Sequence, residues 1–394
     1  MGFFRPTPIP AGIFDVRASA QQAGGMTETG KSLLDVDAQQ LQALGWNDHF
    51  QAQVTELRDA ADSLPPSFVA RVIGVERTGL SIAPHGSLPT DRVPMSGRWF
   101  RGDEETRPTI GDWVIIDAQS GTLLDMLVRR SVIKRVNPLG ALQLIAANVD
   151  TALIVTSCNA DFSPERLERY LSVVMEAGIA PVLVLTKVDL AADAAEYTAS
   201  LAQRFPDIPR FSINALNAED VARLNPWCGS GQTIALLGSS GVGKSTLVNS
   251  LLGGEVQVTA AIREEDGKGR HTTTNRSLHR LPEGGVILDS PGMRELQLAE
   301  AEDGLDQLFA DVDALASMCR FNDCSHGAEP GCAVVRALQS GELDEQRLLS
   351  YQALKAEEMR NRESLAARHS RERAFGKKVR NAVKNKHRGR DVEQ

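Results

Sequence analysis

The sequence predicts a multidomain chain of mixed α/β and β architecture, with an N-terminal β-barrel, a central α/β domain and a C-terminal helical domain that holds a metal ion. Three patterns predict these parts. Short apolar runs separated by turn residues occupy 66–138, strands alternate with helices over 139–302, and a cysteine cluster lies within 303–394. The chain has 394 residues, enough for roughly two to four domains.

Composition narrows the class of protein further. Hydrophobic residues make up 42% of the chain and charged residues 24%, values that exclude collagen-like, wholly disordered and membrane-embedded proteins. No apolar run approaches the ~20 residues that a membrane helix requires, and the opening residues do not form a secretory signal. We therefore expect a cytoplasmic monomer with no membrane partner.

The N-terminal part divides into an extension and a barrel. Residues 1–65 open with a Pro-, Gly-, Ala- and Gln-rich stretch without sustained periodicity, so we expect a partly disordered extension. Between 66 and 138, five short strands predict a barrel of the oligonucleotide-binding (OB) type by their number. The predicted strands are Phe68–Val75, Leu80–Ala83, Gly97–Phe100, Thr109–Asp117 and Leu123–Val128.

From residue 139 to 302, strands and helices alternate. This alternation indicates a mostly parallel sheet with helices on its faces. A helix is predicted to begin at Ser163-Pro164 and to end near Gly178. The predicted strands are Ala152–Thr156, Pro181–Leu185, Pro209–Ile213, Thr233–Leu237 and Gly285–Leu288.

The strongest functional signal is the segment GSSGVGKS, which matches the phosphate-loop pattern G-x-x-x-x-G-K-[ST]. It lies between a predicted strand and a helical segment, as such a loop requires. Backbone N–H groups would face the phosphates, Lys244 would reach the outer phosphates and assist their transfer, and the Ser245 hydroxyl would ligate Mg²⁺. The predicted nucleotide-binding residues of the loop are Gly238, Ser239, Ser240, Gly241, Val242, Gly243, Lys244 and Ser245.

A second motif, Asp289-Ser290-Pro291-Gly292, follows the last predicted strand. Its carboxylate can hold Mg²⁺ through water, and Gly292 can approach the γ-phosphate of a nucleotide. Alone this motif is usually only a turn. It becomes specific because one nucleotide requires both a phosphate loop and a carboxylate for the metal.

A third motif, TKVD at residues 186–189, follows the strand Pro181–Leu185 and resembles the [NT]-K-x-D base-recognition motif of GTPases. In that motif the carboxylate accepts hydrogen bonds from N1–H and the exocyclic amine of guanine, which adenine does not match. Asp189 would therefore select guanine, although a turn in which Asp189 caps a helix is the alternative. The predicted base-contacting residues are Thr186, Lys187, Val188 and Asp189.

The order of these motifs is unusual, because Asp189 precedes Gly238 by 49 residues whereas ordinary GTPases place the base motif after the phosphate loop. Joining neighbouring termini and opening the chain elsewhere can preserve a sheet and its site. The order TKVD, GSSGVGKS, GRHTTT, DSPG and a cysteine cluster resembles the RsgA (YjeQ) family of circularly permuted GTPases. The resemblance extends from about Leu44 to the C-terminus.

The resemblance implies an OB domain, a permuted GTPase domain and a zinc-bearing helical domain that together bind the small ribosomal subunit late in its assembly. The chain departs from the family at Thr186, where asparagine is usual. Threonine keeps a hydroxyl but loses the amide, so we expect weaker nucleotide affinity, with guanine selectivity left to Asp189.

The segment GRHTTT, at residues 269–274, lies where a mobile switch would close over Mg²⁺ and the γ-phosphate. We expect Thr273 to ligate Mg²⁺. Met293 follows the DSPG motif, and a methionine cannot orient water as the glutamine of Ras-like enzymes does. His271 is the candidate for this catalytic role, and a solvent-exposed loop histidine is the alternative.

A cluster of metal-binding side chains follows the α/β region. Cys319, Cys324, His326 and Cys332 supply three thiolates and one imidazole within 14 residues. This is the donor set of a closed tetrahedral Zn²⁺ site that has no open coordination position. The pattern predicts one structural zinc ion per chain.

The basic charge of the chain is concentrated at its C-terminus. Residues 360–394 contain 12 Lys/Arg and 4 Asp/Glu, so this tail carries +8 whereas the rest of the chain carries −16. Such a tail can bind nucleic-acid phosphates without base specificity, or it can be a solvated terminus. Together with an OB-type barrel and a zinc module, the tail favours an RNA partner.

These features predict an enzyme that hydrolyses GTP to GDP and phosphate with Mg²⁺ and binds RNA, and the resemblance implies that the RNA partner is the small ribosomal subunit with its rRNA. We expect turnover to be slow in isolation and stimulated by the subunit, with the nucleotide state controlling binding and release. One alternative is an ATP-dependent RNA-associated enzyme, which ATP competition would reveal. Another is an RNA-binding scaffold with a structural nucleotide, whose RNA affinity would not respond to GTP or GDP.

Overall fold

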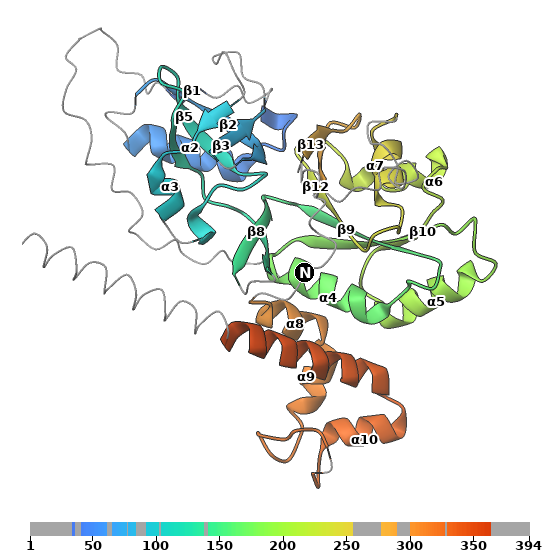
Figure 1. Cartoon of the computed structure of the whole chain (residues 1–394). Coiled ribbons are helices and arrows are strands. Elements are labelled where there is room, and N and C mark those ends of the chain that lie inside the picture. Colours follow the sequence, from blue (N-terminus) through green and yellow to red (C-terminus); the bar gives the residue numbers. More distant parts are fainter. Residues whose placement is uncertain are drawn as a thin grey trace, which may run out of the picture.

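The computed structural model contains an N-terminal sheet, a central α/β layer structure and a C-terminal helical region (Figure 1). It describes residues 34–35, 41–60, 65–76, 78–83, 92–101, 104–137, 141–254, 277–289, 300–327 and 329–363. Within these residues no helix is long and apolar enough to cross a membrane.

The N-terminal sheet is mainly antiparallel and runs in the order β4-β3-β2-β5-β6, with β1 parallel to β2. Alternate residues of β2 and β5 face two different cores, as expected for strands with both faces covered. Helix α2 covers one face through Phe50 and Val54. The strands are β1 (Leu34–Asp35), β2 (Ser67–Val75), β3 (Gly79–Ile82), β4 (Arg92–Pro94), β5 (Trp113–Asp117) and β6 (Leu123–Met126), and the helix is α2 (Asp48–Ala60).

In the N-terminal sheet, one predicted strand was wrong and two strands, β1 and β4, were missed. Gly97–Phe100 lies within a short helix, α3 (Gly97–Arg101), followed by a 3-10 turn at Glu104–Thr106. Periodicity cannot separate a strand from one helical turn in so short an apolar run. Of the two missed strands, β4 contains an arginine and a proline that are typical of a turn, although proline is tolerated at the edge of a sheet.

The central sheet has the order β11-β10-β9-β12-β14-β13, and all its pairs are parallel except β13 with β14. This confirms the predicted mostly parallel sheet. A hairpin of β7 with β8 precedes it. The strands are β7 (Val132–Val136), β8 (Leu142–Ala147), β9 (Thr151–Ser157), β10 (Ala180–Thr186), β11 (Arg210–Ser212), β12 (Thr233–Leu237), β13 (Ser277–Arg280) and β14 (Val286–Asp289).

Helices cover both faces of this sheet. All seven residues of β9 are buried, and alternate residues pack against α4 and α5 on one face and α6 and α7 on the other. Helix α4 begins as predicted, because the Ser163 side chain accepts a hydrogen bond from the Arg166 backbone N–H at its N-terminus. The helices are α4 (Pro164–Glu176), α5 (Ala194–Arg204), α6 (Ala218–Ala222) and α7 (Lys244–Leu251).

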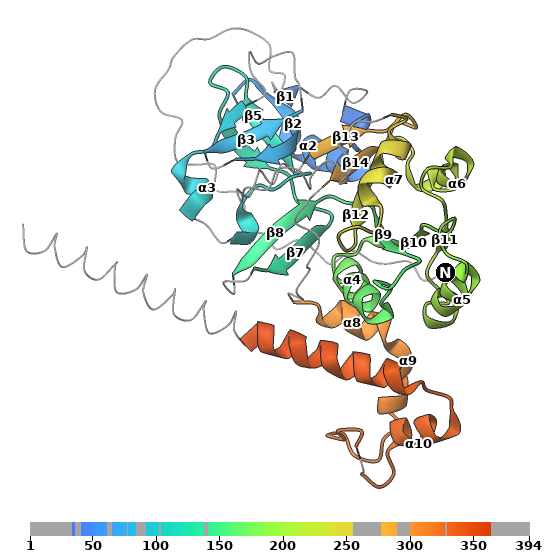
Figure 2. The ribbon, with the colours of Figure 1, turned by 45° about the vertical axis from the view of Figure 1, so that its right-hand side comes forward.

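The C-terminal helical region shares its hydrophobic core with the α/β part. Leu305 and Phe309 belong to the same buried cluster as Leu167 and Leu171 of α4. Gly304 lies so close to α4 that a Cβ atom there would be 2.1 Å from the Ser172 carbonyl oxygen. The region contains α8 (Glu302–Leu308), α9 (Ala310–Ala316), α10 (Ala333–Ser340) and a long helix over residues 345–363, here called the C-terminal helix (Figure 2).

A buried arginine joins the N-terminal sheet to the central sheet. The Arg71 guanidinium donates to the carbonyl oxygens of Leu44 at 3.0 Å and Asn148 at 3.2 Å, and to the Thr233 hydroxyl at 3.3 Å. It also lies 4.9 Å from the centre of the Trp113 ring. Burial lowers the pKa of Arg71 to about 10 despite the nearby acidic residues, yet the side chain stays charged near pH 7.

We expect Arg71→Met to lower the free energy of unfolding by about 3 kcal/mol, because it leaves buried carbonyl oxygens without donors. The matched control is Arg92→Met, which removes an exposed ion pair with Glu76 at 3.4 Å and should cost under about 1 kcal/mol. Urea unfolding of both variants tests this. Equal losses would contradict a structural role for the buried guanidinium.

Candidate functional site

The predicted phosphate loop connects β12 to α7 with backbone conformations that require glycine. Gly238 has φ of 143°, and a Cβ atom there would lie 2.2 Å from the Val155 carbonyl oxygen. Gly241 and Gly243 have φ of 80° and 92°. The loop thus leads into the N-terminus of α7, whose first backbone N–H groups have no partner within the helix and favour an anion.

Lys244, the first residue of α7, folds back over the loop. Its ammonium group donates to the Gly238 carbonyl oxygen at 2.7 Å and also to that of Ser239. These bonds hold the positive charge of Lys244 at the loop. Ser245 follows on the same helical turn and is half-buried.

The predicted base motif touches the phosphate loop directly. Thr186, the last residue of β10, is fully buried, and its hydroxyl donates to the Val242 carbonyl oxygen at 2.6 Å. The same hydroxyl lies 3.0 Å from the Thr156 carbonyl oxygen. Threonine at this position therefore keeps one bond to the loop. Lys187 adds another, because its ammonium donates to the Gly241 carbonyl oxygen at 2.7 Å.

Asp189 lies two residues beyond Lys187 with its side chain exposed at the same edge of the sheet. This juxtaposition follows from strand order, since β10 and β12 both pair in parallel with β9 and their carboxyl ends meet at one edge. Segments separated by 49 residues in the chain therefore form one continuous surface.

One loop beside the base motif carries no recognisable sequence motif. Strand β11 pairs in parallel with β10, with Leu185 opposite Ser212, so the residues after β11 lie beside the base motif. Two leucines on these adjoining loops, Leu190 and Leu216, are 76% and 78% exposed. They offer apolar surface for a planar base, and only knowledge of the strand pairing could have identified them.

Of the remaining predicted site residues, one lies at the end of a described strand. Strand β14 pairs in parallel with β12 and ends at Asp289, which puts the backbone of Asp289 at the edge that carries the phosphate loop. Gly292, His271 and Thr273 lie outside the described residues, as do residues 376–394 of the basic tail.

The four predicted metal ligands do come together. The Cys319 and Cys332 sulfur atoms are 3.8 Å apart, and each lies 3.7 Å from Nδ1 of His326. With Cys324, all four ligand atoms lie within 4.8 Å of one another. Metal–sulfur bonds of about 2.3 Å in a tetrahedron separate two sulfur atoms by about 3.8 Å, so the arrangement fits a tetrahedral metal ion.

The surrounding loop supports this cluster. The backbone N–H groups of Ala333 and Val335 lie 3.4 Å from the Cys319 and Cys332 sulfur atoms, which favours thiolates. The Glu329 carboxylate accepts hydrogen bonds from the hydroxyl and backbone N–H of Ser325 and from the Gly327 N–H. These bonds, the hydroxyl first, lower the pKa of Glu329 to about 2.

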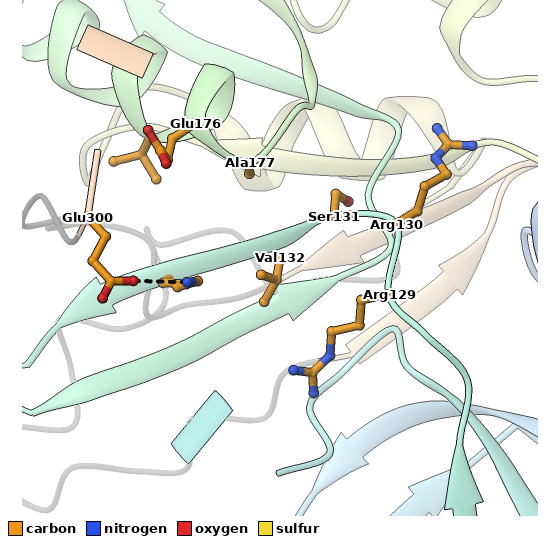
Figure 3. Close-up of a pocket in the computed structure, with 9 residues that line it drawn as sticks. Arg129, Arg130, Ser131, Val132, Glu176, Ala177 and Glu300 are labelled. Atoms are coloured by element: carbon orange, nitrogen blue, oxygen red, sulfur yellow. Dashed lines mark hydrogen bonds and ion pairs between the residues drawn. The ribbon is translucent and has the colours of Figure 1, made fainter. Parts of the chain in front are cut away.

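A separate cavity of about 250 Å³ lies where β7, the end of α4 and Glu300 meet (Figure 3). Its charged side chains already have partners. Lys134 pairs with Glu300 at 3.0 Å, Arg129 pairs with Asp112 at 2.7 Å, and the Glu176 carboxylate accepts from the Gly304 N–H at 2.8 Å. The cavity is therefore a structural junction, distinct from the phosphate loop.

The fold and site define a P-loop protein whose base motif precedes its phosphate loop, the arrangement of a circularly permuted GTPase. The RsgA GTPase family model matches residues 126–299. Among curated proteins, the chain is 45% identical to small ribosomal subunit biogenesis GTPase RsgA 2 of Vibrio parahaemolyticus, over 88% of this chain and 93% of that protein. It is 44% identical to the RsgA of Mesorhizobium japonicum, over 81% and 90%. The chain belongs to the RsgA family.

Solved structures show the same fold. YjeQ from Thermotoga maritima matches with a TM-score of 0.55 at 21% identity, over 73% of this chain and 97% of that chain. YloQ, a circularly permuted GTPase, matches with a TM-score of 0.51 at 23% identity, over 75% and 97%. The permuted topology is thus confirmed.

We expect Cys324→Ser to lose most of its bound metal, because one of four ligands is removed and metal binding contributes to folding of the cluster loop. Metal analysis of freshly purified, unchelated protein measures this directly. Cys158→Ser serves as control, since Cys158 lies outside the cluster and should leave the metal content unchanged. Full metal occupancy in Cys324→Ser would refute the assigned ligand set.

Proposed function

We propose that this chain is a GTPase that binds the small ribosomal subunit and its rRNA and acts late in subunit assembly. The observation that carries the nucleotide assignment is the hydrogen bond from Thr186 to Val242, which joins the base motif to the phosphate loop. The ribosomal assignment rests on the names of relatives at 43–45% identity, which describe GTPases of small ribosomal subunit biogenesis.

In this proposal, catalysis is mainly positioning and charge stabilisation. Lys244 and the loop N–H groups would bind the phosphates. Ser245 and Thr273 would ligate the Mg²⁺ that accompanies GTP, Asp289 would hold it through water, and the bound ion would supply positive charge against the phosphates. His271 positions the attacking water, because Met293 cannot do so. Asp189 selects guanine, and Leu190 and Leu216 contact the faces of the base.

We further propose that the cysteine cluster binds one structural zinc ion. Three thiolates and one imidazole are a zinc donor set, and the 3.8 Å sulfur separation supports it. Such an ion would hold the loop between α9 and α10. No ligand position remains for a reacting group, so this ion would have no part in hydrolysis.

We propose that the N-terminal sheet forms an OB-type barrel, and that this barrel and the basic tail together bind the RNA. The strand pairs described form an open path, and closure of the barrel remains part of this proposal. The acidic rest of the chain repels a polyanion such as RNA, whereas the basic tail attracts it, so we expect the tail to make the first contact with RNA. We expect the protein to act as a monomer in the cytoplasm, because ribosomal subunits assemble there.

The test of the proposed function is steady-state GTP hydrolysis with and without purified small subunits. We expect slow intrinsic turnover and stimulation by about 10-fold or more, equivalent to ~1.4 kcal/mol of barrier, because the subunit would order the catalytic histidine. Large subunits and the Lys244→Ala variant are the controls, and neither should support stimulated turnover. Rapid turnover that is indifferent to subunits would refute the proposal, and inhibition by ATP would favour an ATP-dependent enzyme.

A further inference from the structure

The first turn of α4 lies against the phosphate loop. The Arg166 guanidinium donates to the Ser239 hydroxyl at 2.6 Å. Ser239 is the second residue of the loop, and its carbonyl oxygen accepts from Lys244. Arg166 therefore holds the loop residue that in turn holds the phosphate-binding lysine. Sequence reasoning did not single it out.

The next turn of α4 contacts the C-terminal helix. Arg169 pairs with Glu357 of that helix at 2.6 Å. Glu168 is fully buried, and its carboxylate accepts from Arg347 at 2.9 Å and from the Ser350 hydroxyl of the same helix. Three residues of α4, Arg166, Glu168 and Arg169, thus connect to two elements that are distant in sequence.

These contacts differ in what they contribute. Glu168 also pairs with Arg204 at 2.8 Å, and removing one partner from such a buried network is strongly destabilising. This network fixes the C-terminal helix on α4. By contrast, Arg166 is exposed and the Arg169–Glu357 pair is partly exposed, so each contributes little to stability. They can be changed without unfolding the chain.

Open space beside the turn leaves room for movement. A cavity of about 440 Å³ separates part of the first turn from the C-terminal helix. Arg166 and Arg169 line it on one side, and Leu349 and Ala353 on the other. Side chains of the turn can therefore shift without repacking the shared core.

We propose that the first two turns of α4 couple the phosphate loop to the C-terminal helix, with Arg166 as a positioning residue for the loop and Arg169 as the link to the helix. This inference rests on the proposed nucleotide site. Coupling is reciprocal: if the nucleotide changes the docking of the helix, the docking must change nucleotide affinity by the same factor. A partner that binds the C-terminal region would then act on the phosphate loop through α4.

The experiment uses the full-length chain without ribosomes. Hydrogen exchange over residues 346–358 is compared between GDP and a non-hydrolysable GTP analogue, and the dissociation constants of both are measured by competition with fluorescent GDP. The variants are Arg166→Ala, Glu357→Gln, their combination, and Arg166→Lys as a conservative rescue. Lys355→Ala is the matched control, because it lies on the same helix but pairs with Asp306 of α8.

We expect the hydrogen-exchange rate of the C-terminal helix to differ about five-fold between the two nucleotides, which is the lower end of the coupling factors typical of linked sites. Arg166→Ala should abolish that difference. Glu357→Gln should alter the GTP-to-GDP affinity ratio, and the double variant should match Arg166→Ala, because both break one path. Arg166→Lys should restore part of the response, and Lys355→Ala should behave as wild type.

Identical exchange with both nucleotides, or a Glu357→Gln variant with the wild-type affinity ratio, would overturn the coupling while leaving the nucleotide site intact. Additive effects in the double variant would equally overturn a shared path. Failure of the wild-type chain to bind either guanine nucleotide would instead refute the proposed function, and this inference with it.

Discussion

The site depends on one hydrogen bond, from the buried Thr186 hydroxyl to the Val242 carbonyl oxygen. It ties the end of β10 to the phosphate loop and makes one surface from two segments. The bond is possible because β9 lies between β10 and β12, and parallel pairing brings both strand ends to one edge. The geometry depends on the order of strands in space, so a chain that connects them in a different order still forms the same site.

Buried charged residues connect the N-terminal sheet and the C-terminal helix to the central α/β part. Arg71 joins the N-terminal sheet to the start of β12, and Glu168 joins α4 to the C-terminal helix. Each is costly to bury and is stabilised only by several partners in a defined geometry. These contacts therefore anchor the accessory regions to the central α/β part, and the C-terminal region also shares its core.

The sequence correctly predicted those features that short local patterns of residues determine. The strand Thr233–Leu237, the positive φ angles of the loop glycines and the clustering of Cys319, Cys324, His326 and Cys332 all follow from short patterns and are confirmed. The helix at Gly97–Arg101 was mistaken for a strand, because one turn has no distinguishing period. Leu216 and Arg166 were missed because their positions depend on strand pairing and helix packing, which no local pattern encodes. The roles of His271 and Thr273 stay predictions.

The most direct test of a single guanine site built from the two segments is nucleotide competition with Asp189→Asn. The carboxylate matches two donors of guanine, whereas an amide can donate to the C2 carbonyl of xanthine. We predict that the variant loses affinity for GTP by about 10-fold or more, ~1.4 kcal/mol, and gains affinity for xanthosine triphosphate. Unchanged affinity for GTP, with no gain for xanthosine triphosphate, would remove Asp189 from the site and contradict its assembly from the base motif and the phosphate loop.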